Sequence, residues 1–242
     1  MLVEFNFLLL LKLFLPPFIY IMILYLTAPN KTLNLRIAGL CFFGGILSTN
    51  FVQLYYAFVD ILTNDPFTVQ FFSVAPREEI CKLIAFGGVM AAFRKETIHP
   101  VATMFYMGIV GLGFATFENF MYGMMYGESI VLPRSITATL AHLIFGLFLG
   151  YWMGLGKIDL GKYGNRSLFG FYMYKYKKLK MGVYTLIGLL SAIIFHGLWN
   201  YNLTVSWMAA TPIMILMIVF GLSTAKFGST DLNNHYRKSL KK

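Results

Sequence analysis

The chain has 242 residues, of which 58% are hydrophobic and only 12% are charged, and its formal net charge is +10. This composition is too apolar for a water-soluble domain of this length, and the apolar residues form long blocks rather than amphipathic stripes. The blocks also lack the period-two alternation of β-barrel strands. We therefore predict an all-α, polytopic transmembrane helix bundle that forms a single domain over residues 1–242. Membrane proteins collect Lys and Arg in cytoplasmic loops, so the positive charge does not require a nucleic acid partner, and we expect none.

Hydropathy predicts about seven spanning helices. The first block is too long for a signal peptide and lacks a basic start, so we predict a span kinked at Pro16 and Pro17. Residues 67–74 are apolar but too few to span, which predicts a short re-entrant or interfacial segment. Residues 221–242 are predicted to be a polar, poorly ordered cytoplasmic tail. The predicted spans are 7–28, 37–59, 78–93, 101–125, 136–155, 181–201 and 205–220.

The basic residues predict the orientation of these spans. Lys and Arg gather in alternate loops, most densely in the loop 156–180, whereas the opposite side has only Arg77 and Arg134. The positive-inside rule then puts the amino terminus outside and the carboxyl terminus in the cytoplasm. The loop 156–180 is also rich in aromatic residues, and we expect it to lie on anionic lipid of the bilayer.

A few ionisable or polar side chains interrupt the apolar blocks. Each ionisable group costs roughly 2.5–3.5 kcal/mol at the centre of a membrane helix, so such groups usually have a function. On the predicted topology they all lie within roughly 10 Å of the outer surface of the hydrocarbon layer. Glu78 and Lys82 are four residues apart, as are His196 and Asn200, so each pair shares a helix face. The set comprises Glu78, Glu79, Lys82, Glu118, His142, His196 and Asn200.

These residue types suit the hydrolysis of an amide. That reaction needs an activated water, a proton donor for the leaving amine and a donor to the oxyanion. Carboxylates, imidazoles and an amide supply these functions, whereas no Ser or Cys lies beside a base as a nucleophile would. Glu and His are also good zinc ligands, but the His-Glu-x-x-His signature of zinc proteases is absent, so we expect no metal cofactor.

The order of these motifs resembles the PrsW family of intramembrane proteases, which belongs with the CPBP superfamily of type II CaaX prenyl proteases. The resemblance covers about residues 76–200, the predicted catalytic core. Lys82 stands where the CaaX enzymes have Arg one residue further on, and Phe117 is not followed by the CaaX His, which favours PrsW. The matching residues are Glu78-Glu79-Ile80-Cys81-Lys82, Phe117-Glu118-Asn119-Phe120-Met121-Tyr122, His142 and His196-Gly197-Leu198-Trp199-Asn200.

The resemblance also implies residue roles and a substrate class. A glutamic-type protease in the plasma membrane would cut a membrane-tethered protein, for example an anti-sigma factor, near the extracytoplasmic face. Glu78 would activate water, with Glu79 at the site and Lys82 paired with a carboxylate. The remaining assignments are acid–base chemistry for Glu118 and His142, oxyanion stabilisation for His196 and Asn200, and substrate binding for Asn119 and Tyr122.

Two other functions remain open from the residues alone. Intramembrane carboxylates and histidines also form proton relays or ion sites in transporters. Transporters, however, usually have polar residues at the midplane and matched halves, which this chain lacks. A non-catalytic, immunity-type membrane protein that only binds a partner would keep the same residues for structural reasons.

Overall fold

The computed structural model describes residues 7–29, 32–58, 64–93, 99–158, 177–205 and 223–240, with a few single residues between 212 and 221. These residues form helices and no strands, which confirms the predicted all-α class. The elements are α1 (Phe7–Thr27), α2 (Leu35–Phe58), α3 (Pro66–Val69), η2 (Gln70–Val74), α4 (Ala75–Ala92), α5 (Pro100–Tyr126), η3 (Glu128–Ile130), α6 (Val131–Lys157), α8 (Lys177–Val205), η5 (Thr224–Gly228) and α10 (Ser229–Leu240).

Five of the described helical segments are long and apolar enough to cross a membrane, which confirms a multi-pass membrane protein. They lie in α1, α2, α5, α6 and α8. The predicted span 78–93 lies in α4, which is not among the five because it carries four charged residues in its 18-residue length. The predicted span 205–220 and the basic loop 156–180 fall largely outside the described residues.

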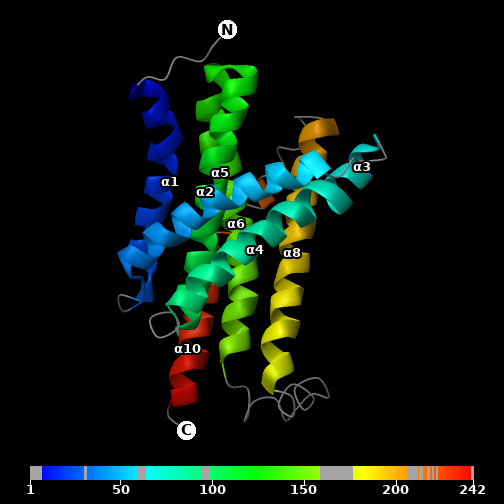
Figure 1. Cartoon of the computed structure of the whole chain (residues 1–242). Coiled ribbons are helices and arrows are strands. Elements are labelled where there is room, and N and C mark those ends of the chain that lie inside the picture. The colour runs from blue at the N-terminus through cyan, green and yellow to red at the C-terminus, as the bar shows by residue number, and fades with distance from the viewer. Residues whose placement is uncertain are drawn as a thin grey trace.

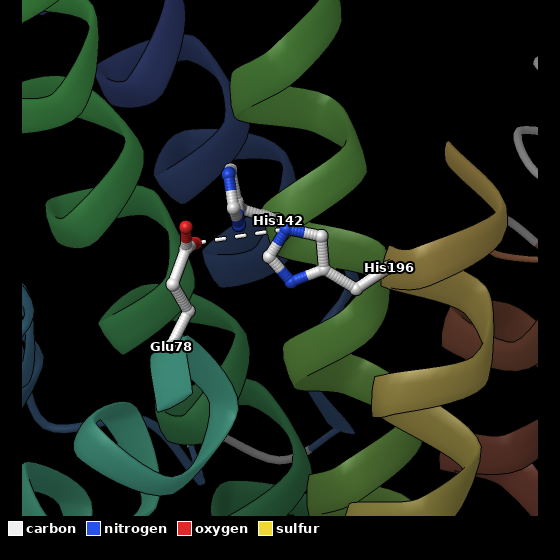
Figure 2. Close-up of side chains that lie close together, drawn as sticks. All are labelled: Glu78, His142 and His196. Atoms are coloured by element: carbon white, nitrogen blue, oxygen red, sulfur yellow. Dashed lines mark ion pairs between the residues drawn. The ribbon is translucent and has the colours of Figure 1, made fainter. Parts of the chain in front are cut away.

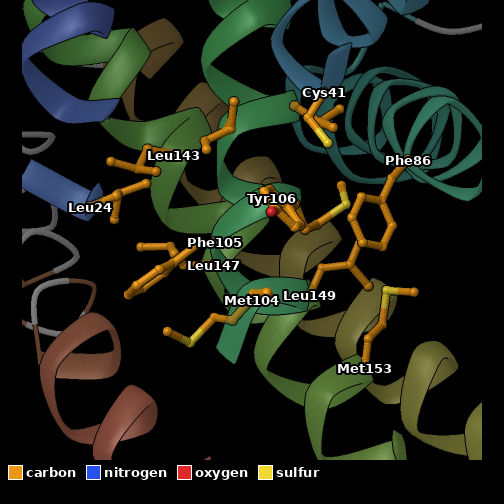
Figure 3. Packing of buried hydrophobic residues seen from close by; sticks show 14 of the residues in the cluster. Leu24, Cys41, Phe86, Met104, Phe105, Tyr106, Leu143, Leu147, Leu149 and Met153 are labelled. Atoms are coloured by element: carbon orange, nitrogen blue, oxygen red, sulfur yellow. The ribbon is translucent and has the colours of Figure 1, made fainter. Parts of the chain in front are cut away.

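Helix α5 forms the centre of the bundle. Every residue from Pro100 to Thr116 is buried, so other helices surround this part of α5 on all sides. In Figure 1, α1, α5, α6 and α8 run along the length of the bundle, whereas α2 and α4 cross it obliquely. Figure 3 shows side chains from α1, α2, α4 and α6 packed around Met104, Phe105 and Tyr106 of α5.

Glycines allow α5 and α6 to approach closely. A Cβ added to Gly146 of α6 would lie 2.5 Å from the carbonyl oxygen of Met107 in α5 and 2.8 Å from the Cα of Gly108. Small residues at such crossings let helix backbones pack where no hydrophobic effect drives association. This close crossing places His142, one turn before Gly146, beside α5.

The predicted short segment 67–74 is helical and runs directly into α4. Asp65 caps α3, because its side chain accepts a hydrogen bond from the backbone nitrogen of Thr68, and Pro66 occupies the first turn. The hydrogen bonds from Thr68 lower the pKa of Asp65. The π-helical turn η2 then joins α3 to α4 without a break. Such π-helical turns occur frequently at functional sites.

The predicted poor order of the tail is wrong for the described residues 223–240. These residues form η5 and α10, and Leu232 of α10 is fully buried in the main hydrophobic core. The hydroxyl of Tyr151 in α6 donates to Asp231 at 3.2 Å. The buried Leu232 and the hydrogen bond of Asp231 thus hold α10, a helix of mostly polar residues, against the bundle.

Candidate active site

Four helices bring the predicted site residues together. α4 contributes Glu78, Glu79 and Lys82, which are at most 5% exposed, although they occupy the charged start of that helix. α6 contributes His142 and α8 contributes His196, and both are buried. α5 adds Glu118, whose side chain is 17% exposed.

Lys82 holds the middle of the cluster. Its Nζ lies 2.7 Å from Oε1 of Glu79 and 2.8 Å from Nδ1 of His142. It also lies 4.1 Å from the centroid of the Phe114 ring. An ammonium group can only donate, so Nδ1 of His142 accepts and a neutral ring carries its proton on Nε2. That nitrogen lies 3.3 Å from Oε2 of Glu118, which is the acceptor for the proton.

His196 is oriented by the same carboxylate that holds Lys82. Its Nδ1 lies 2.8 Å from Oε1 of Glu79, so the Nδ1–H donates to the carboxylate. The other ring nitrogen, Nε2, then faces Oε2 of Glu78 at 3.6 Å (Figure 2). Such a separation is too long for a direct hydrogen bond, and a water beside the pair, on the cavity side, can contact both atoms.

Glu78 combines an unpartnered carboxylate oxygen with a place at the cavity wall, whereas Glu79, whose buried Oε2 also has no partner among the described residues, does not line the cavity. Oε2 of Glu78 is buried and has no hydrogen-bond partner among the described residues. Lys82 Nζ approaches this oxygen only to 3.7 Å. Buried polar atoms are usually paired, so an unpaired carboxylate oxygen at a cavity wall indicates an atom reserved for a ligand, water or substrate.

The cluster borders a cavity of about 370 Å³. Polar side chains and the apolar side chains of Met121, Met125 and Trp199 share its wall. Ligand sites commonly combine an apolar wall with a few convergent polar groups. The polar lining includes Glu78, Glu118, Tyr122, Arg134, His142 and Asn200.

Asn119 was predicted to bind substrate, but the structure places its amide in contacts within the protein. Its Nδ2 donates to Thr139 at 3.0 Å, and its Oδ1 accepts from Nε of Arg134 at 3.1 Å. Asn119 is fully buried and is not among the residues that line the cavity. Tyr122, the other predicted substrate-binding residue, does line the cavity.

Arg134 is the site residue that the sequence reasoning missed. Its Nη2 donates to Oε2 of Glu118 at 3.0 Å, and its guanidinium lies 3.6 Å from the centroid of the Tyr122 ring. The sequence pattern places Arg134 only on the outer flank, before an apolar block that begins at residue 136. α6 instead begins at Val131, which places Arg134 two turns before His142 on the same helix. The signal available in the sequence was an arginine within helical reach of a predicted site histidine.

A metal ion is the other occupant to test against this geometry. Glu78, His142 and His196 each present a ligand atom, and these atoms lie within 4.8 Å of one another. Two imidazoles and a carboxylate form a common zinc ligand set. The contacts of Lys82 and Glu118 with the two ring nitrogens, however, leave His142 no free lone pair.

The charge balance of the cluster indicates which carboxylate is left to act as a base. With neutral histidines, the three carboxylates of the cluster face two cations, Lys82 and Arg134. The cluster therefore carries one net negative charge, and Glu78 is the carboxylate whose Oε2 lacks a close cation, 3.7 Å from Nζ of Lys82. In the described arrangement His142 has no lone pair free for a metal ion, whereas Glu78 and His196 each present a ligand atom.

Comparisons with known proteins agree with the motif order. A family model described as "PrsW family intramembrane metalloprotease" matches residues 33–224. The protein named "Protease PrsW" of Oceanobacillus iheyensis is 25% identical over 187 residues, which cover 76% of this chain and 78% of that relative. The Protease PrsW of Shouchella clausii is 30% identical over 95 residues, which cover 39% of this chain and 36% of that relative.

Other comparisons add shorter matches. The Protease PrsW of Clostridioides difficile is 25% identical over 140 residues, and this chain spans 51% of its length. No solved structure matches the chain. Because the family model covers most of the sequence, the chain belongs to the PrsW family.

Proposed function

We propose that this protein is an intramembrane endopeptidase that hydrolyses a peptide bond with a water activated by Glu78. The observation that carries the proposal is the free Oε2 of Glu78, which is buried at the wall of the cavity and faces Nε2 of His196 at 3.6 Å. The relatives named Protease PrsW support peptide hydrolysis as the reaction class.

The chemistry follows from the two acceptors. A water bound between them donates one proton to Oε2 of Glu78 and the other to Nε2 of His196, which turns an oxygen lone pair toward the substrate. As the new O–C bond forms at the scissile carbonyl, Glu78 takes the water proton. Glu78 then delivers this proton to the leaving amine as the C–N bond breaks. The amide of Asn200 borders the cavity and supplies a donor to the oxyanion.

The remaining polar residues hold this pair in place. Glu79 fixes the ring of His196 through Nδ1 and fixes Lys82 through the same oxygen. Lys82 in turn sets the tautomer of His142, and we assign His142 and Glu118 to the second acid–base pair at the cavity wall. No step of this mechanism uses a metal ion, although the name of the family model includes one.

The substrate class follows from the surroundings of the site. The apolar part of the cavity wall suits an unwound segment of a membrane-tethered protein. We propose that the site lies near the extracytoplasmic face of a plasma membrane, with the amino terminus outside, which the distribution of Lys and Arg supports. We therefore propose site-1-type cleavage, for which an anti-sigma factor is a suitable substrate, and kinship with the CPBP superfamily.

The test is cleavage of tagged single-span membrane proteins in liposomes, with and without a chelator. We expect Glu78→Gln to lower the rate by about 10²- to 10⁴-fold, the usual contribution of an acid–base group. His142→Ala should also lose activity, and the chelator should have no effect. Glu128→Gln is the matched control, because Glu128 pairs with Lys12 away from the cluster.

Two results would contradict the proposal. Cleavage by Glu78→Gln at the wild-type rate would remove Glu78 from the chemistry. Loss of wild-type cleavage with the chelator, and its return with zinc, would show that the enzyme depends on a metal.

A further inference from the structure

Arg134 stands at one end of a chain of polar contacts that crosses the bundle. This series of contacts passes through side chains of α6, α5, α4 and α8 and ends beside Glu78. Its links measure 3.0, 3.3, 2.8, 2.7 and 2.8 Å. In order, the residues are Arg134, Glu118, His142, Lys82, Glu79 and His196.

Donors and acceptors alternate along this chain. Arg134 and Lys82 can only donate, and ionised carboxylates can only accept, so each neutral imidazole has one possible proton position. Hydrogen bonds between ionised partners are about twice as strong as neutral ones. Oε2 of Glu118 lies 3.3 Å from Nε2 of His142 and is placed to accept the Nε2–H. The ring of His142 is therefore oriented by Glu118 at Nε2 together with Lys82 at Nδ1.

Arg134 fixes Glu118 with a two-armed contact. Nη2 donates to Glu118 at 3.0 Å while Nε donates to Oδ1 of Asn119 at 3.1 Å. The guanidinium also stacks on Tyr122, 3.6 Å from the ring centroid. All three partners lie on one face of α5, so the contact locks α6 to α5 beside the cavity. A lysine could supply the charge but not the planar fork.

We infer that Arg134 is a positioning residue of the proposed hydrolase, which holds Glu118 against His142 and so keeps the second acid–base pair aligned at the cavity. The kinetic consequence rests on the proposed function, whereas the alignment of His142 can be observed without any substrate.

The kinetic test compares Arg134→Met and Arg134→Lys in the liposome assay, using the tagged protein that the wild type cuts. A loss of alignment of about 1 Å can reduce the rate of an enzyme by about 100-fold, which is the fall in kcat that we expect for Arg134→Met. The kcat should change more than KM, because the lost contact between Arg134 and Glu118 acts through His142, although Arg134 and Tyr122 also line the cavity. Arg134→Lys should recover part of the loss.

Lys12→Met is the matched control. Lys12 forms an ion pair with Glu128 at 2.6 Å, and its side chain is 23% exposed, close to the 24% of Arg134. Removal of this cation should leave kcat unchanged. A wild-type kcat in Arg134→Met, or a loss confined to KM, would overturn the positioning role.

A spectroscopic test separates this inference from the proposed function. The chain has four histidines, so ¹⁵N-histidine labelling in detergent micelles gives a simple spectrum, and His142→Ala assigns one signal. We expect a slowly exchanging Nε2–H signal of His142 in the wild type and in Lys12→Met, and its loss to solvent exchange in Arg134→Met. A signal that persists in Arg134→Met would refute the inference even if the enzyme is active, and its loss would support the inference even if no substrate is cut.

Discussion

Gly146 links the packing of the bundle to the geometry of the candidate site. An alanine there would place its Cβ 2.5 Å from the carbonyl oxygen of Met107, whereas ordinary contacts begin at 3.4 Å. α6 would have to retreat from α5 by the difference, about 0.9 Å, since backbone atoms on both sides cannot rotate away. Overpacking of this kind costs about 1–3 kcal/mol. For a protein of this size that corresponds to a fall in Tm of roughly 2–12 °C.

The same displacement should affect activity, because His142 lies one turn before Gly146 and its partner Glu118 lies on α5. A misplacement of about 1 Å costs about 100-fold in rate. Thermal unfolding in micelles and cleavage in liposomes measure the two effects. Gly87→Ala is the matched control, since nothing lies within 4 Å of a Cβ at Gly87. If Gly146→Ala unfolds at the wild-type temperature and keeps the wild-type rate, the close crossing of α5 and α6 does not constrain the site.

Three further substitutions test other parts of the structure by thermal unfolding. Lys82→Met should cost about 3–5 kcal/mol of folding stability, because it leaves Glu79 buried without its cation. Adding Glu79→Gln should recover much of this stability. No recovery would argue against an ion pair between the two side chains. Leu232→Ala should cost about 2–5 kcal/mol if α10 is docked as described, and the exposed Asn234→Ala should cost nothing measurable. Burial lowers the pKa of His99 from its usual 6.5, so the folded state favours the neutral ring. The contribution of His99 to stability is therefore present above pH 6.5 and is lost as the pH falls through the lowered pKa. His99→Asn keeps a helix cap and should weaken the dependence of the unfolding temperature on pH. An unchanged pH dependence would exclude His99 as its source.

The composition of the chain was sufficient to predict a membrane-embedded helical bundle. Hydrophobicity is a property of a local window, so long apolar blocks predict helices before any packing is known. The same blocks made the candidate site visible, because an ionisable side chain within them is costly and therefore conspicuous. Glu118 and His142 were found in this way, and the order of the motifs pointed to the PrsW family.

The choice of partners within the site depended on the tertiary structure. Spacing along the helix suggested that Lys82 would face Glu78, yet Lys82 lies 2.7 Å from Glu79 and 3.7 Å from Glu78. Asn119, which the sequence predicts to bind substrate, instead has its amide hydrogen-bonded to Arg134 and Thr139, and it does not line the cavity.

These differences have one physical reason. The sequence determined which polar groups enter the apolar layer, because their cost and their spacing are local properties. The tertiary structure decided which of them pair and which oxygen remains free, because the partners come from helices that are far apart in the sequence. Glycine crossings such as Gly146 on Met107 set the spacing of α5 and α6, and in the assembled bundle Oε2 of Glu78 remains an unpaired acceptor at the cavity.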